Sequence, residues 1–378
     1  MFFLESLSSI ISWVAPFLVV LTVLVFIHEL GHYLVARYNG VKIEVFSIGF
    51  GPEIFGWTDS KETRWKFSLI PLGGYVRMFG DANEASAPNF DQLNKLSEQD
   101  KNQTLEGKTV WQRMAVSVAG PLANILLTFA LLSIFFFSVG KPSDAPVIGI
   151  IKAESVAEKA GLESGDRILR MNDFSPNSFK DIQTYINARP DEGMTIQIER
   201  QGKMAMYSIV PGVFEISSSK SVGVIGVGPS VVKKSLFEAP VEALRSVGTM
   251  SFDLLRMLGS VVSSGKDASR LGSVLSIAKM SKDSFQGGIF PLLFFMAILS
   301  LNLGVINLLP IPMLDGGHLL FYIIEAIKGS PVAEKAQEIS YRIGFGILIF
   351  VMLFTLWNDF SRFKIVEYFL KLFREIFF

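Results

Sequence analysis

The chain has 378 residues, of which 50% are hydrophobic and 19% charged, and its mean hydropathy is +0.41. This is the composition of a membrane protein, and the formal net charge of +0 gives no sign of a nucleic-acid partner. Because the sequence has no cysteine, disulfides, thiolate metal sites and a cysteine nucleophile are excluded, so any metal must be held by His, Asp or Glu. The opening stretch, MFFLESLSSI, has no basic residue before the apolar run, and a cleaved signal peptide is not expected.

Four apolar stretches are each near the length that a helix needs to cross about 30 Å of hydrocarbon. They predict transmembrane helices at roughly residues 11–36, 113–139, 289–309 with a continuation at 318–327, and 341–357. Two prolines interrupt the third span. Such a break within a bilayer is tolerated only where protein or water shelters the freed backbone groups, so it points to a functional site.

Basic residues follow the first span and precede the second, which predicts that residues 38–112 face the cytoplasm. Both termini and the large middle segment are then expected on the other side of the membrane.

The first span ends in the sequence IHELGH, at residues 27–32. On a helix, His28 and His32 project from one face, so both imidazoles can reach a single ion. Glu29 lies beside them, able to approach a bound water without ligating the metal, and this is the zincin motif. The alternative is a pair of hydrogen-bonded core histidines, which would place costly polar groups in lipid. The pattern therefore predicts a metal site within the membrane.

Alternating residues in VKIEVFSIGFG and WKFSLIPLGGYVRM predict short strands close to the membrane, at 41–49 and 65–78, with a turn at 71–74. The next stretch, residues 81–108, is polar and aperiodic and is expected to be a mobile loop.

In the second span, AGPLAN places Gly120 and Asn124 on a ridge that permits close helix approach. We expect these two residues to serve packing, with an indirect role in the site.

Residues 147–213 predict a soluble domain between the second and third spans. AEKAGLESGDRILRMND indicates a helix that ends at a glycine turn before an apolar strand, FKDIQTYINA an amphipathic helix, and MTIQIERQGK and MAMYSIVPG two alternating strands. This order resembles a PDZ domain, which binds extended peptides by adding a strand to an open edge. The alternative is a spacer domain that binds no ligand.

Residues 239–265, which follow this domain, are amphipathic and are expected to lie along the membrane face.

Catalytic zinc takes three protein ligands and keeps one position open for water, so a third ligand is needed. The candidate is Asp315 in NLLPIPMLDGGH, at the interruption of the third span. At a rise of 1.5 Å per residue, His28 lies roughly 25 Å along the first helix from the outer face of the membrane. Asp315 lies a similar distance along its own span, so the two residues are expected at a similar depth. Asp315 could instead cap the helix that follows it.

Asn307 lies at the same break. Its amide could donate to the oxyanion that develops during catalysis or hold the substrate backbone, and the alternative is that it caps the broken helix. His318 is expected to support the site or begin the helix rather than bind the ion.

The combination of HELGH, GPLAN, a PDZ domain and NLLPIPMLDGGH resembles the site-2 protease family, and within it the bacterial regulator-of-sigma-E proteases. The resemblance implies that His28, His32 and Asp315 bind zinc, that Glu29 is the catalytic glutamate and that Asn307 assists near the active site. It also implies that PLGGYVRM belongs to a membrane-associated β-hairpin that contacts substrate. The best-known enterobacterial members carry two PDZ domains in tandem, whereas this sequence has room for a single one.

The sequence thus predicts a polytopic α-helical membrane protein with four transmembrane helices, a membrane-associated β-hairpin region and an inserted PDZ (α+β) domain. The expected boundaries are 1–40 (first span), 41–112 (cytoplasmic segment), 113–140 (second span), 141–215 (PDZ domain), 216–286 (juxtamembrane amphipathic segment) and 287–378 (third and fourth spans with a C-terminal helix).

The expected function is that of an intramembrane zinc endopeptidase, cutting transmembrane segments in regulated intramembrane proteolysis, for example of anti-sigma factors or signal-peptide remnants. The alternatives are a non-catalytic PDZ-bearing scaffold and a membrane-tethered metalloprotease acting on soluble peptides. Expected partners are transmembrane protein or peptide substrates, a peptide ligand of the PDZ domain and the lipid bilayer, without nucleic acid. The expected location is the bacterial inner (plasma) membrane, multi-pass, with the PDZ domain on the periplasmic side.

Overall fold

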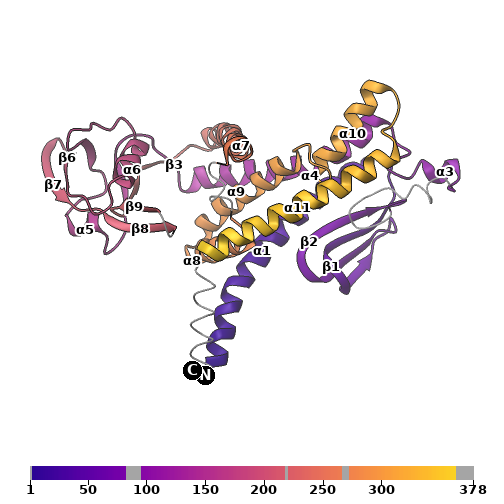
Figure 1. Ribbon diagram of the computed structural model, residues 1–378, viewed down its shortest axis with the longest axis horizontal. Helices are drawn as coiled ribbons and strands as arrows, with labels where there is room; N and C mark the ends of the chain where they lie inside the picture. Colours follow the sequence, from indigo (N-terminus) through magenta and orange to yellow (C-terminus); the bar gives the residue numbers. More distant parts are fainter. Residues whose placement is uncertain (1, 82–94, 218–219, 266–271, 363–378) are drawn as a thin grey trace. The chain divides into compact units, whose positions relative to one another are not determined.

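The structure is a computed structural model that describes residues 2–81, 95–217, 220–265 and 272–362. It divides into two compact units (Figure 1). The helical unit contains the described residues up to Ser133 together with Pro240–Asp359, and the middle unit contains Ile134–Ala239.

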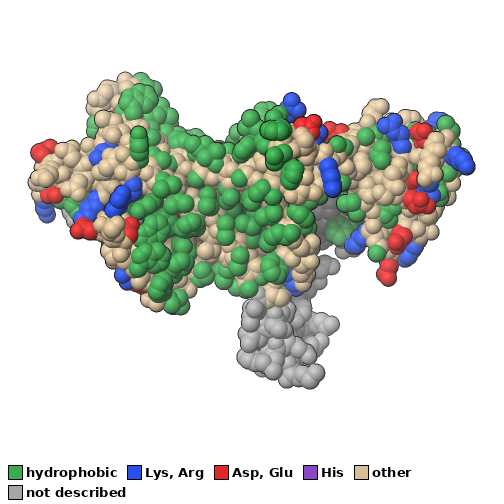
Figure 2. All heavy atoms as spheres, turned by 180° about the vertical axis from the view of Figure 1, so that it is seen from behind, with side chains coloured by type: hydrophobic (Ala, Val, Ile, Leu, Met, Phe, Trp, Pro, Cys, Tyr) green, Lys and Arg blue, Asp and Glu red, His purple; other side chains and the backbone are tan. Residues whose placement is uncertain are grey.

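The helical unit is built mainly from long helices. These are α1 (Phe2–Tyr38), α4 (Val110–Ser138, whose last turn passes into the middle unit), α7 (Glu238–Ser264), α8 (Val274–Gln286), α9 (Ile289–Asn307), α10 (Asp315–Lys328) and α11 (Glu334–Arg362). Among the described residues, four segments are long and apolar enough to cross a membrane: Ser12–Tyr38, Val110–Ser138, Ile289–Asn307 and Glu334–Phe360. They coincide in position with the four apolar stretches of the sequence, the third of them as far as its break. Many exposed side chains on α11 are large and apolar, and Figure 2 shows broad areas of hydrophobic side chains, as a lipid-facing surface requires.

The predicted break of the third span is confirmed. Helix α9 ends at Asn307, the chain turns through the two prolines, and α10 begins at Asp315. The following glycines make this turn possible, because a Cβ at Gly316 would collide with the Leu309 carbonyl, and Gly317 is equally crowded by the turn. The turn therefore folds back tightly against the first residues of α10, which places the start of that helix at the break.

A small antiparallel sheet, β1 (Ile43–Thr58) and β2 (Arg64–Met78), packs on α1. Both strands bend, so Phe46 pairs with Val76 on one side and with Trp65 on the other. The first half of β1 therefore lies between the two halves of β2, and residues 74–78 form one edge of the sheet, which we call the edge segment. The predicted strands are confirmed, and β1 runs further than the alternation indicated. Its second half, residues 53–58, pairs with the first half of β2.

The segment before α4 was expected to be part of a mobile loop. Residues 82–94 lie outside the described residues, so the expectation stays untested there. The described remainder contains a short helix, α3 (Glu98–Lys101), whose N-terminus is capped by the Ser97 side chain. The Lys42 N–H also donates to the Gln103 carbonyl at 2.9 Å. This end of the segment is therefore ordered by local capping and by a backbone bond beside the sheet.

The middle unit has its own hydrophobic core, which includes Ile168, Met171, Ile182, Ile196 and Ile198. Its elements are β3 (Lys141–Pro142), β4 (Ile148–Ile151), α5 (Val156–Lys159), β5 (Arg167–Met171), α6 (Phe179–Asn187), β6 (Met194–Arg200), β7 (Lys203–Ile209), β8 (Gly212–Ser217), β9 (Lys220–Val224), β10 (Val227–Pro229) and β11 (Val231–Val232). The predicted helices and strands are confirmed. The unit extends beyond the expected boundary at 215, because β10 pairs with β4 and β11 with β3.

Candidate metal centre

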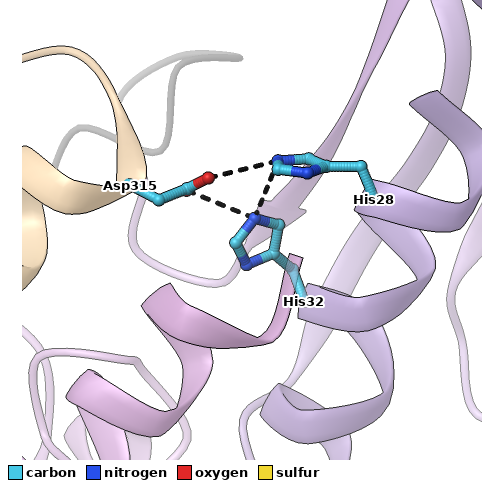
Figure 3. A group of neighbouring side chains, drawn as sticks. All are labelled: His28, His32 and Asp315. Atoms are coloured by element: carbon cyan, nitrogen blue, oxygen red, sulfur yellow. Dashed lines mark hydrogen bonds and ion pairs between the residues drawn. The ribbon is translucent and has the colours of Figure 1, made fainter. Parts of the chain in front are cut away.

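Three side chains meet at one point of the helical unit (Figure 3). The Nε2 atoms of His28 and His32 lie 3.3 Å apart, and each lies 3.2 Å from an oxygen of the Asp315 carboxylate. The two histidines are only 8% and 9% exposed. The structure therefore brings together the three ligands predicted from the sequence, two from α1 and one from the start of α10.

The hydrogen bonds behind the imidazoles prepare them to bind a metal. The His32 Nδ1–H donates to the Val116 carbonyl at 2.8 Å, which leaves the Nε2 lone pair pointing into the site. His28 Nδ1 lies 3.1 Å from Nδ2 of Asn124, whose Oδ1 has no partner among the described residues. Turning this amide by half a turn would let Oδ1 accept from His28 Nδ1–H, the arrangement that a metal-binding His28 requires.

The alternative role of Asp315 as a helix cap is not what the structure shows. The N-cap residue of α10 is Leu314, which makes no side-chain cap bond, and Asp315 is the first residue inside the helix. Its carboxylate is directed at the two histidines instead. Two imidazole nitrogens and one carboxylate oxygen match the donors of a catalytic zinc site with a fourth position open to water.

Helices α1 and α4 approach closely beside these ligands. A Cβ at Gly31 would collide with the Ala119 carbonyl, and a Cβ at Gly120 would collide with the imidazole of His32. The predicted packing role of the AGPLAN segment is therefore confirmed. The structure adds a direct contact that the pattern did not indicate, since Asn124 reaches His28 itself.

A cavity of about 160 Å³ opens beside the three ligands and is lined by Glu29. Gly74 and Val76 of the edge segment line the same cavity, and a Cβ at Gly74 would lie 3.4 Å from Cγ of Glu29, so the edge segment lies against this side chain. Asn307 places its Nδ2 3.4 Å from His28 Nε2. His318 also lines the cavity but is not one of the three grouped ligands, and its Nδ1 lies 3.3 Å from the Tyr341 hydroxyl.

Comparison with known proteins places the chain in a family. The model of peptidase family M50 matches residues 16–351. The chain belongs to peptidase family M50. It is 40% identical over 368 residues to a Brucella suis protein named "Putative zinc metalloprotease", covering 94% of this chain and 97% of that protein. It is 38% identical over 357 residues to a protein of the same name from Rhizobium meliloti, covering 92% and 96%.

A further relative is the metalloprotease MmpA of Caulobacter vibrioides, 34% identical over 381 residues and covering 93% of this chain and 96% of that protein. Among solved structures, the PDZ domain of an SdrC-like protein from Listeria innocua is similar to part of the chain. It is 23% identical and covers 23% of this chain and 93% of that domain, with a TM-score of 0.19.

A buried charged cluster of this M50 chain was missed from the sequence. Arg113 near the start of α4 is 7% exposed, and its guanidinium donates to Glu325 of α10 at 2.5 Å and to Glu106 at 3.1 Å. Burial raises the pKa of Glu106, an effect that the nearby Arg113 opposes. Tyr322 lines both the cavity at this cluster and the cavity at the metal ligands. The available signal was a charged residue at the end of an apolar span, which is costly unless paired.

Proposed function

We propose that this membrane protein is an intramembrane zinc endopeptidase that cuts peptide bonds within transmembrane segments of other membrane proteins. The observation that carries the proposal is the convergence of two imidazoles of α1 with the carboxylate at the break between α9 and α10. His28 and His32 lie inside an apolar segment, Ser12–Tyr38. A tethered protease for soluble peptides would place these ligands in an aqueous domain instead.

Zinc would be held by His28, His32 and Asp315, in keeping with the names of the relatives. When bound, zinc lowers the pKa of water at its open position and polarises the scissile carbonyl. The fit rests on this chain's own donor set: two buried imidazole nitrogens, one of them held in the metal-binding tautomer by the Val116 carbonyl, and one carboxylate.

The remaining chemistry belongs to two side chains in the same region. The Glu29 carboxylate would remove a proton from the attacking water and then deliver it to the leaving nitrogen of the cleaved peptide bond. The Asn307 amide N–H would donate to the oxygen that becomes negative when the carbonyl is attacked. Glu29 lines the cavity beside the three candidate ligands, where it can reach a water bound there.

The substrate would bind in an extended form. A helical segment hides its carbonyl groups in its own hydrogen bonds, so it must unwind locally before it can be cut. Residues 74–76 of the edge segment line the catalytic cavity, and an unwound strand could pair with them by strand addition. We expect helix-weakening residues in a substrate to favour cleavage. Equal cleavage of a substrate whose central residues are all replaced by Leu would contradict this expectation.

The proposal includes an orientation in the membrane. Basic residues flanking the first two spans favour a cytoplasmic location for residues 38–112, with the middle unit on the periplasmic side of the bacterial inner membrane. A PDZ domain in the middle unit would bind a peptide of the substrate or of a regulator by strand addition. Transmembrane substrates in regulated intramembrane proteolysis are the expected partners.

The experiment compares purified wild-type protein with Glu29→Gln in liposomes containing a synthetic transmembrane peptide. Glu29→Gln should slow cleavage by about 10²-fold or more, because a general base is lost. It should also keep one bound metal per chain by elemental analysis, because the three ligands are intact. Cleavage by Glu29→Gln at the wild-type rate, or active wild-type protein without metal, would overturn the proposal.

A further inference from the structure

His318 is the third histidine of the chain, and it lines the cavity beside the metal ligands without a role in the reaction described above. It lies one helical turn after Asp315 in α10, so the two side chains project from the same face of that helix. The turn that begins α10 is tightly packed, since a Cβ at Gly316 or Gly317 would collide with a carbonyl of the break. The turn that presents Asp315 therefore also holds His318 at the site.

The hydroxyl of Tyr341 fixes the proton on this imidazole. Tyr341 belongs to α11, and its hydroxyl oxygen lies 3.3 Å from His318 Nδ1. A phenol proton that is withdrawn from water needs an acceptor, and among the described residues Nδ1 is the hydrogen-bond partner that this hydroxyl has. The hydroxyl therefore donates to Nδ1, which places the imidazole proton on Nε2.

Helix α11 is anchored where it makes this contact. A Cβ at Gly344, one turn after Tyr341, would collide with the Pro312 carbonyl, so α11 packs directly on the break. The Tyr341 ring also meets Phe321 of α10 edge-on, with ring centroids 5.9 Å apart. These contacts hold the hydroxyl against His318.

The other nitrogen of the His318 imidazole is available to a substrate. Nε2 makes no hydrogen bond within the part of the chain that the structure describes, and His318 is not one of the three grouped ligands. Its side chain nevertheless lines the cavity that Glu29 and those ligands share. An N–H donor at this wall can reach an oxygen of a peptide bound in the cavity.

We propose that His318 is a catalytic residue of the peptidase, whose Nε2–H donates to the oxygen of the scissile carbonyl as that oxygen becomes negative. The inference rests on the proposed function, because it needs a peptide bond at the metal ligands. A donor that is already oriented stabilises the developing charge without reorganisation. Asn307 ends α9 and His318 lies in the first turn of α10, so the two donors come from the two sides of the break. Tyr341 is then a positioning residue, which acts through the tautomer and orientation of His318.

The test measures kcat and KM for full-length protein in liposomes. The substrate is a synthetic apolar peptide of about 25 residues with a Gly-rich centre, long enough to span a bilayer. His318→Phe keeps a ring but has no donor, and it should lower kcat by about 10²- to 10³-fold with KM and bound metal unchanged. His318→Gln keeps an N–H and should recover most of the loss. A wild-type kcat in His318→Phe, or loss of its metal, would overturn the inference.

Tyr341→Phe gives a second test, in case His318→Phe does not fold. It should lower kcat by about tenfold without changing KM or bound metal, as expected for the partner that orients a functional imidazole. In folded His318→Phe the same change should have no further effect, because no imidazole is left to orient. A kcat that Tyr341→Phe leaves unchanged would show that the hydroxyl does not prepare a donor, and would also overturn the inference.

Binding of a phosphinic peptide gives a readout that does not depend on turnover. Its tetrahedral, negatively charged phosphinyl group replaces the scissile carbonyl and resembles the oxyanion. His318→Phe should bind this peptide at least about tenfold more weakly than wild type does, whereas the affinity for the uncut carbonyl peptide, measured in Glu29→Gln protein, should not change. Equal affinities of wild type and His318→Phe for the phosphinic peptide would contradict the proposed contact.

The outcome for His318 is separable from the outcome for the proposed function. Wild-type cleavage that Glu29→Gln abolishes supports the proposed function by itself, and a normal kcat in His318→Phe would then remove the role of His318 alone. If wild-type protein makes no cut that Glu29→Gln abolishes, the proposed function fails and the inference fails with it.

Discussion

At the scale of single residues, the metal ligands depend on partners from α4. The Val116 carbonyl selects the tautomer of His32 by accepting from its Nδ1–H, and the Asn124 side chain contacts Nδ1 of His28, the nitrogen that faces away from Asp315. Such partners hold imidazoles in orientation and raise their basicity, and losing one costs metal affinity even though the ligands themselves remain. The two histidines are therefore prepared for the ion by the neighbouring helix.

Replacing Asn124 with Leu should weaken metal binding by about 10- to 100-fold, because His28 loses the partner of its Nδ1. Asn124→Asp keeps an oxygen that can accept from Nδ1 and should stay closer to the wild-type affinity. Competition with a chelator, followed by measurement of the metal left on the protein, gives both values. Equal affinity for Asn124→Leu and wild type would show that this contact does not orient the ligand.

At the scale of secondary-structure elements, small residues and one buried cation hold the helices around the site. Gly31 and Gly120 let α1 and α4 touch, which a side chain at either position would prevent. Arg113 joins α4 to α10, the helix that begins with Asp315, and also contacts the described end of the preceding segment. Close backbone approach and this ion cluster together place the carboxylate opposite the histidines.

Gly120→Ala should abolish metal binding and cleavage, because the added methyl group would collide with the His32 imidazole. Gly248→Ala in α7 is the matched control, since nothing lies within 4 Å of a Cβ there. The control should be neutral or stabilising by about 0.5–1 kcal/mol, the usual preference for Ala over Gly inside a helix. Metal content and thermal unfolding of both variants test the pair, and full metal occupancy in Gly120→Ala would refute the expected collision.

Arg113→Met should lower the free energy of unfolding by about 3–5 kcal/mol, because Glu325 and Glu106 would be left without their cation. Adding Glu325→Leu to this variant should recover part of the loss, since one uncompensated carboxylate is removed. Thermal unfolding of the single and double variants measures the coupling. A double variant less stable than Arg113→Met alone would argue against a paired charge cluster.

At the scale of the whole molecule, the metal would connect parts of the chain that are distant in sequence. His28 and His32 belong to the first helix, whereas Asp315 begins α10, just after the break that ends α9. An ion bound by all three would therefore stabilise the helical unit as well as supply chemistry, because a ligand that binds the folded state shifts unfolding toward higher temperature.

Removing the metal with a chelator should stop cleavage and lower the unfolding temperature of wild-type protein, and adding zinc back should restore both. Glu29→Gln should show the same change in unfolding temperature without any recovery of cleavage, since its metal ligands are intact. An unfolding temperature that does not respond to chelation, in protein shown to have lost its metal, would contradict a structural link through the ion.

The sequence by itself determined the apolar stretches, the break at the prolines, the strands and the three candidate metal ligands. Each of these is expressed by neighbouring residues, through hydrophobic period, ligand spacing on a helix or glycine and proline at a turn. The position of Asp315 beside the histidines could be predicted because its motif lies at an interruption that a lipid environment makes costly.

Only the tertiary structure decided the contacts of Val116 and Asn124 with the imidazoles, the Arg113 cluster and the hydrogen bonds between Asp81 and Met78. A backbone carbonyl has no signature in the sequence, since every residue carries one. The partners of Arg113 are distant along the chain, and the direction of the groups at Met78 depends on strand register. Register and helix approach are set by packing across the whole helical unit, which no local pattern encodes.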